Sequence, residues 1–226
     1  MTEQHGKDLK KEAIRLLRSL REVEPVPTYL GPAAEIFRFT RTNANTHGKY
    51  VLAKLTVLPS GGPPPHIHYL SNEWFYTPKA GLVFYMGTNE YHDITQVPGR
   101  TAPKDHVHIV EAGDNEILYG RRNYVHGFVN NSSEPLELWS IWAPAYPDAP
   151  NPILEYIEAV GQPVEDVNNP PPVLPRNAIK FVGDATKFSI NMSASFWEYV
   201  ATIEDSAESH EAQLSKLIEV LKSGGH

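Results

Sequence analysis

The stretch from residue 34 to residue 143 is built of short runs rich in β-branched and aromatic residues. Turn-forming segments such as Pro59-Ser60-Gly61-Gly62 and Asn130-Asn131-Ser132-Ser133 separate these runs. Many short runs at this spacing predict an all-β sandwich or barrel with antiparallel strands. The runs are EIFRFT, YVLAKLTVL, EWFYT, GLVFYM, HDITQV, HVHIV, NEILY, YVHGFV and LELWSIWA.

The segments on either side of this stretch have a helical pattern instead. Apolar residues recur at helical spacing in residues 7–22, in residues 151–161 and in about the last 20 residues. A Pro-rich stretch at 161–176 predicts an extended strap over the barrel surface, because no second core follows it. We therefore divide the chain into an N-terminal helix and lead-in at 1–33, a barrel at 34–143, and a C-terminal strap with helices packed on the barrel at 144–226.

Composition excludes several classes of protein. The 226 residues are 41% apolar and carry a formal net charge of −7, which suits one acidic globular domain. Lys and Arg form no stripe, so nucleic acid is not expected as a partner, and no basic amphipathic helix or long apolar run suggests a membrane. The absence of cysteine excludes disulfides, thiolate metal sites and a cysteine nucleophile. No secretory signal precedes the first helix, which favours a cytoplasmic location.

Three histidines and one glutamate form the pattern that carries chemistry. His66 and His68 alternate on a β run and should project from the same face. Glu73 begins the next run, which can return beside them, and His126 should complete the set from across the barrel. Three imidazoles and one carboxylate suit Fe, Mn, Ni, Cu or Zn. We expect all four residues to bind one divalent metal ion.

The same residues resemble the two motifs of the cupin superfamily. His66-x-His68, four further residues and Glu73 match the first motif, and His126 followed three residues later by Asn130 matches the second. The departures are confined to turn positions, where the chain has Gly61, Ala80, Ile117 and Asn123 instead of the usual residues or spacing. The resemblance covers about 34–143 and implies a single antiparallel cupin barrel, that is, a double-stranded β-helix or jelly-roll, with the N- and C-terminal helices outside it.

The Pro63-Pro64-Pro65 run before His66 is similar to quercetinase-type dioxygenases and related cupins of secondary metabolism. This resemblance implies a mononuclear metal-dependent dioxygenase, with iron as the first choice of metal and Glu73 as the catalytic base. The substrate would be a small aromatic or enolisable organic molecule, used together with O2. A metal-dependent isomerase, cyclase, dehydratase or decarboxylase of the cupin type is an alternative. So is a cupin that binds a small molecule without turnover.

Other residues are interpreted more simply. His106-x-His108 lacks a matching acidic partner and is assigned to a barrel strand, and His92 and Asp93 are placed in a solvated excursion around 88–108. Lys and Arg are scarce near the motifs, where only Arg121 and Arg122 occur, so a neutral or enolisable ligand is expected rather than a phosphorylated one. The leading helix and the strap carry surplus apolar residues, which predicts a homodimer. The aromatic residues expected in the core or pocket wall are Tyr69, Trp74, Tyr76, Phe84, Tyr85, Phe128, Trp139 and Trp142.

Overall fold

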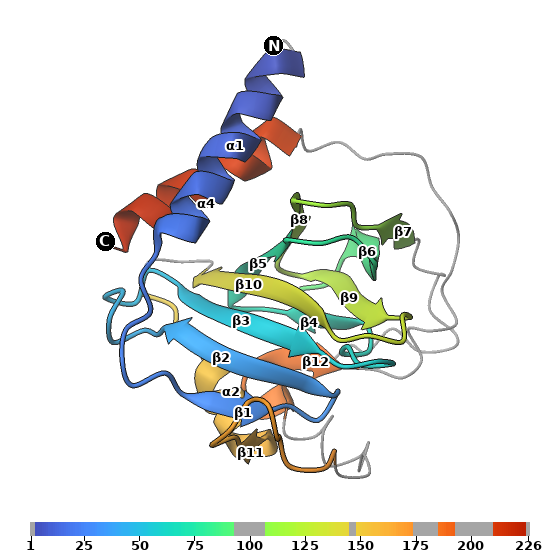
Figure 1. Ribbon diagram of the computed structural model, residues 1–226. Coiled ribbons are helices and arrows are strands. Elements are labelled where there is room, and N and C mark those ends of the chain that lie inside the picture. The colour runs from blue at the N-terminus through green and yellow to red at the C-terminus, as the bar shows by residue number, and fades with distance from the viewer. Residues whose placement is uncertain (1–2, 93–106, 145–147, 174–184, 193–209, 225–226) are drawn as a thin grey trace.

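Two antiparallel β-sheets form the centre of the computed structural model, which describes residues 3–92, 107–144, 148–173, 185–192 and 210–224 (Figure 1). In sheet order, the larger sheet contains β11 (Gln162–Pro163), β1 (Thr28–Leu30), β2 (Glu35–Arg41), β3 (Val51–Val57), β10 (Leu136–Pro144), β5 (Ser71–Thr77) and β8 (Glu116–Gly120). The smaller sheet contains β12 (Ile190–Met192), β4 (His66–His68), β9 (Tyr124–Asn130), β6 (Leu82–Glu90) and β7 (Val107–Glu111).

The crossovers between sheets give the molecule its barrel. Consecutive strands β4 and β5 lie in different sheets, and so do β8 and β9, whereas every described strand pair is antiparallel. This is the double-stranded β-helix architecture that the sequence predicted. Strands β1, β11 and β12 lie outside 34–143 and still extend the two sheets, while the division of the chain into three parts stays a prediction.

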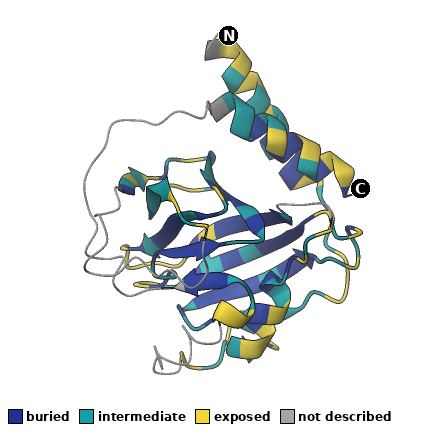
Figure 2. Cartoon of the chain, turned by 180° about the vertical axis from the view of Figure 1, so that it is seen from behind, coloured by how far each residue is buried: buried dark blue, intermediate teal, exposed yellow. Residues whose placement is uncertain are grey.

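The larger sheet is apolar on both faces. Along β10, Leu138 and Trp142 belong to the core inside the barrel, whereas Trp139 and Ile141 belong to a second buried cluster outside it. This alternation follows from the two-residue period of a strand. The sheet therefore needs a cover on its outer face, and Figure 2 shows buried residues across the strands.

That cover is a pair of helices from opposite ends of the chain, α1 (Glu3–Ser19) and α4 (His210–Ser223). They run parallel, since Gly6 lies beside the Glu211 side chain and Glu12 lies 3.7 Å from the Lys222 ammonium group. Both terminal helices confirm the sequence prediction. Their buried residues pack with the outward aromatic residues of the sheet: Ala13, Leu16, Leu17, Leu214, Leu217, Ile218 and Leu221 against Trp74, Tyr76 and Trp139.

A third helix, α2 (Ile153–Val160), confirms the prediction for residues 151–161 and packs against the barrel core rather than the outer cluster. All of the predicted run HDITQV except His92, and most of the predicted excursion at 88–108, lie outside the described residues, as does the end of the strap after residue 173. Among the helices that the structure describes, none has the length and apolar character needed to cross a bilayer.

Candidate metal centre

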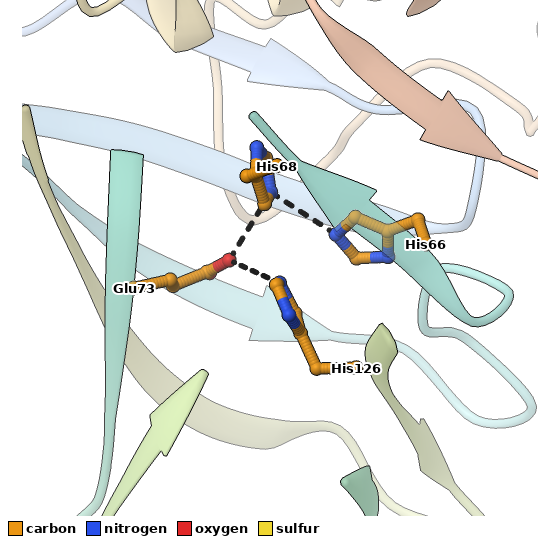
Figure 3. Close-up of side chains that lie close together, drawn as sticks. All are labelled: His66, His68, Glu73 and His126. Carbon is orange, nitrogen blue, oxygen red and sulfur yellow. Dashed lines mark hydrogen bonds and ion pairs between the residues drawn. The ribbon is translucent and has the colours of Figure 1, made fainter. Parts of the chain in front are cut away.

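Strand pairing brings the three histidines together on the smaller sheet. His66 of β4 is directly opposite His126 of the neighbouring strand β9, and His68 shares the face of His66. Glu73 lies on β5 in the other sheet and faces the three imidazoles (Figure 3). We expected Glu73 beside the two histidines and His126 across the barrel. This expectation was wrong, because Glu73 lies across the barrel and His126 lies on the strand next to His66. The chain changes sheets between His68 and Glu73, which sequence spacing does not show.

The four side chains converge on one point. Their candidate ligand atoms all lie within 4.8 Å of one another. His66 Nε2 and His68 Nε2 are 3.1 Å apart, and Glu73 Oε2 is 3.3 Å from both His68 Nε2 and His126 Nε2 (Figure 3). Ligand atoms that share a metal ion at about 2.1 Å lie about 3.0–3.4 Å apart in tetrahedral or octahedral geometry. The spacing therefore fits a single small divalent ion.

Backbone carbonyls orient two of the imidazoles. His66 Nδ1 donates to the Pro64 carbonyl at 2.9 Å, and His126 Nδ1 donates to the Tyr124 carbonyl at 3.1 Å. Because a carbonyl can only accept, each Nδ1 carries a hydrogen, so Nε2 is the ring nitrogen that remains to face a metal ion. The Nε2 atom of His126 is buried and forms no hydrogen bond with a described residue, although the Glu73 carboxylate oxygen lies 3.3 Å away. Such an atom fits a metal-ligand role.

Burial decides the charge states of the centre. His66, His68, Glu73 and His126 are each at most 4% exposed. Burial, helped by the neighbouring His126 and His68, lowers the pKa of His66 well below its usual value, and burial also lowers the pKa of His68. Burial would raise the pKa of Glu73, but its contacts with His126 and His68 outweigh this and lower it to about 2. At neutral pH His66 and His68 therefore offer imidazole lone pairs and Glu73 offers a carboxylate, which are donors that a divalent transition metal requires.

A small cavity opens beside His66, His68 and Glu73. Its volume is about 40 Å³, enough for a few waters or one compact ligand. None of the described residues that line it is Lys or Arg. Apart from three of the metal-site residues, its wall consists of Pro32, Ala33, Glu35, Phe37, Leu55, Pro63, Phe128, Ser140, Trp142, Ile153, Tyr156, Ile157 and Ile190.

Several of these wall residues were not predicted from the sequence. Pro32 and Ala33 belong to the predicted lead-in, and the three residues of α2 and Ile190 of β12 belong to the predicted C-terminal part. Glu35 and Ser140 are buried polar residues inside the barrel, and their strands read as ordinary β runs. The only available signal was the period of two along each strand, which gives the face of a residue and not its distance from the histidines.

Other predicted residues take different positions. Of the eight aromatic residues expected in the core or pocket wall, Phe128 and Trp142 line the cavity, while Trp74, Tyr76 and Trp139 face the helical cover. His108 lies on β7 opposite Met86, apart from the group of four, and its partner His106 lies outside the described residues. The exposed His92 ring is 3.6 Å from the Glu90 carboxylate.

Comparison with known proteins gives structural matches only. No family model matches the sequence, and no curated protein matches it. Solved structures that match include a predicted oxalate decarboxylase from Thermotoga maritima, which is 13% identical with a TM-score of 0.40 over 55% of this chain and 97% of that one. An RmlC-like cupin from Shewanella frigidimarina is 13% identical with a TM-score of 0.36 over 57% of this chain and 94% of that one. A double-stranded β-helix protein from Klebsiella pneumoniae is 16% identical with a TM-score of 0.33, over 57% of this chain and 86% of that one.

Matches at this level concern the fold alone. The sheet order of this chain and the inward His66, His68, Glu73 and His126 define a double-stranded β-helix with a buried group that could hold one metal ion. The metal and the reaction are not given by the fold, since one fold hosts many chemistries.

Proposed function

We propose that this chain is a mononuclear metal-dependent cupin enzyme that binds one divalent transition metal through His66, His68, Glu73 and His126. The observation that carries the proposal is the convergence of four buried ligand atoms beside a cavity with an otherwise mainly apolar wall. Iron is our first choice, and Mn, Ni, Cu or Zn would suit the same donors. A divalent ion held there would act as a Lewis acid toward a substrate oxygen and leave coordination positions open for O2 or water.

The cavity restricts the substrate. A volume of about 40 Å³ favours a compact molecule, and the absence of Lys and Arg from the described wall gives no clamp for a phosphate. Within the range of small aromatic or enolisable compounds that the sequence suggested, the wall favours the compact enolisable ones. Phe37, Phe128 and Trp142 supply flat apolar surfaces against which such a molecule can pack.

Glu73 is the proposed catalytic base. With a pKa of about 2 it is ionised at neutral pH, but it is a weak base as long as its carboxylate contacts His68 and His126. When a contact lengthens, the burial of the carboxylate raises its pKa, and it becomes able to take a proton from an enolisable carbon or a hydroxyl group.

The reaction that we propose is dioxygenation. The His-x-His, Glu and His pattern after three prolines resembles quercetinase-type dioxygenases, and a compact, mainly apolar cavity suits O2 and an enolisable partner. A non-oxidative isomerase, cyclase, dehydratase or decarboxylase would use the same centre without O2, and a binding protein would hold the ligand unchanged. Oxygen uptake during incubation with a panel of enolisable substrates separates dioxygenation from the other two.

The metal site is tested by two variants with different expected results. His66→Ala removes a ligand, so its metal affinity should fall by more than about 100-fold, because losing a residue that merely supports a ligand already costs about 10–100-fold. Glu73→Gln keeps three imidazoles and should keep substantial metal, while kcat should fall by about 10²–10⁴-fold if the carboxylate is the base. Metal content after metal-supplemented expression and steady-state kinetics measure these effects.

His108→Ala is the matched control, because His108 is a histidine of the same sheet that lies outside the group of four. Its metal content should equal that of the wild type. Equal and negligible metal in the wild type and in His66→Ala would contradict the metalloenzyme proposal.

A further inference from the structure

Two hydrogen-bond donors in the cavity wall have no partner among the residues that the structure describes. They are the Ser140 hydroxyl group and the Trp142 indole N–H, and both residues line the cavity. Ser140 is 0% exposed and Trp142 is 2% exposed. Buried polar groups are nearly always hydrogen-bonded, so two unpaired donors in one wall require an explanation.

Strand register places both donors on the wall that carries Glu73. In the pairing of β10 with β5, Trp142 is opposite Glu73 and Ser140 is opposite Phe75. Directly paired residues share a face of the sheet, so Ser140 and Trp142 lie on the inner face together with Glu73. The donors therefore belong to the same chamber as the metal-site residues.

The other two tryptophans that the structure describes have paired indole N–H groups. Trp139, on the outer face of the same strand, donates to the Glu137 carboxylate, and Trp74 donates to the Gln213 carbonyl at 3.2 Å. Packing alone would be satisfied by Ala and Phe at positions 140 and 142. Among the described residues, unpaired buried groups also occur away from the cavity, at the Tyr50 hydroxyl and His108 Nε2, but Ser140 and Trp142 are the two whose residues line the cavity and share one wall, where a ligand can approach.

We propose that Ser140 and Trp142 recognise an acceptor oxygen of the substrate and thereby determine specificity for a compact enolisable carbonyl compound. This inference rests on the proposed function and deepens it. Both donors are neutral, and the described wall has no Lys or Arg, so a carbonyl or enol oxygen fits this wall better than a phosphate. A substrate with two neighbouring oxygens could bind a metal ion held by the site through one oxygen and accept hydrogen bonds from these donors with the other.

Two probes and four proteins test the inference. The proteins are the cobalt-loaded wild type, Ser140→Ala, Trp142→Phe and the matched control Trp139→Phe, which makes the same change on the outer face of β10. Acetohydroxamic acid is a compact carbonyl compound whose oxygens bind divalent metals, whereas ethanethiol binds through sulfur and presents no oxygen. The visible spectrum of cobalt reports the binding of each probe and its dissociation constant.

All four proteins should load cobalt equally. The dissociation constant of acetohydroxamic acid should rise about three- to tenfold in Ser140→Ala and in Trp142→Phe, as for the loss of one hydrogen bond, and should stay unchanged in Trp139→Phe. Ethanethiol should bind equally to all four. A fifth protein, Ser140→Thr, keeps a hydroxyl group and should retain the wild-type affinity for acetohydroxamic acid. Together with Ser140→Ala it tests the inference even if Trp142→Phe folds poorly.

Unchanged acetohydroxamic acid affinity in both cavity variants overturns the inference, and so does an equal loss for both probes, which would mean that the wall is merely reshaped. Neither result contradicts the proposed metal site. A wild type that takes up no cobalt overturns the proposed function as well, and metal content shows this before any probe is added.

Discussion

Protonation of the buried histidines should make the metal-free protein sensitive to acid. The pKa values of His66 and His68 are lower in the folded chain than the usual 6.5, so below pH 6.5 the unfolded chain binds more protons than the folded one. Stability should therefore be unaffected by these groups above pH 6.5. It should fall by up to about 1.4 kcal/mol per pH unit for each histidine as the pH drops from there toward the folded-state pKa values.

Urea unfolding of the metal-free protein at pH 7.5, 6.5 and about 5 measures this slope. Glu73, whose pKa is lowered to about 2, adds its own loss only below its usual value of 4.5, so the two effects are separated in pH. The double variant His66→Gln/His68→Gln should have a flatter dependence between about pH 6.5 and 5. An equally steep slope in this variant would assign the acid sensitivity to other groups.

Gly120 provides the space for the His126 ring. A Cβ atom at this position would lie 3.1 Å from His126 Cγ and 3.1 Å from the Phe75 ring, which is tighter than normal packing. Gly120→Ala should therefore shift the imidazole and weaken metal affinity on the order of tenfold, as for the loss of a supporting residue. Metal titration of the variant checks this. Gly113→Ala is the control, since a Cβ there meets only the end of the Glu116 side chain at 3.8 Å.

The residues that the sequence identified and those it missed differ in a physical way. His66, His68, Glu73 and His126 were found because metal ligands need particular residue types at spacings that two strand motifs provide. Ser140 and Glu35 were missed because a serine or glutamate in a β run is ordinary, and only the closed barrel puts them beside the histidines. The sequence thus indicated which residues have metal-binding chemistry, but it did not give the distances between residues on opposite walls of the barrel.

The helical cover, formed by α1 and α4, should contribute to stability without contributing to the metal site. Leu217 of α4 is fully buried in the cluster on the outer face of the sheet. Leu217→Ala should lower the free energy of unfolding by about 2–5 kcal/mol, through lost burial and a residual cavity. Metal content per folded protein should be unchanged, because this cluster lies on the other side of the sheet from the cavity.

Denaturant unfolding with metal analysis on the same samples measures both quantities. Glu219→Ala on the same helix is the control, since Glu219 is exposed and its loss should change stability by less than about 0.5 kcal/mol. A loss of metal from folded Leu217→Ala would show that the cover also shapes the site.

Elements were predictable from the sequence where periodicity was strong. The strands between 34 and 143 and the helices α1, α2 and α4 follow from alternation and helical spacing. The short strands β1, β11 and β12 were not predicted, because two or three residues give no period and their pairing is decided by distant partners. The sequence also did not show on which face of the sheet Trp74 and Tyr76 lie. Aromatic residues on the inner and outer faces give the same pattern when the outer face is covered by helices.

At the scale of the whole molecule, the homodimer stays a prediction. Fewer apolar residues support it in the structure than in the sequence, because those of α1 largely pack against α4 and the barrel. The strap still exposes Val167 and Val173, at 42% and 43%. We expect light scattering at micromolar concentration to give a mass near twice 25.3 kDa. A particle of 25.3 kDa would rule the dimer out.

The parallel pairing of α1 and α4 has a consequence for how the protein is made on the ribosome. Helix α1 emerges first, but the helix that completes the cover follows the last barrel strand by many residues. Until then, a nascent chain with a finished barrel presents Trp74, Tyr76 and Trp139 to solvent or to chaperones. Premature termination before α4 should therefore yield a chain that aggregates, even though it contains every residue of the candidate metal centre.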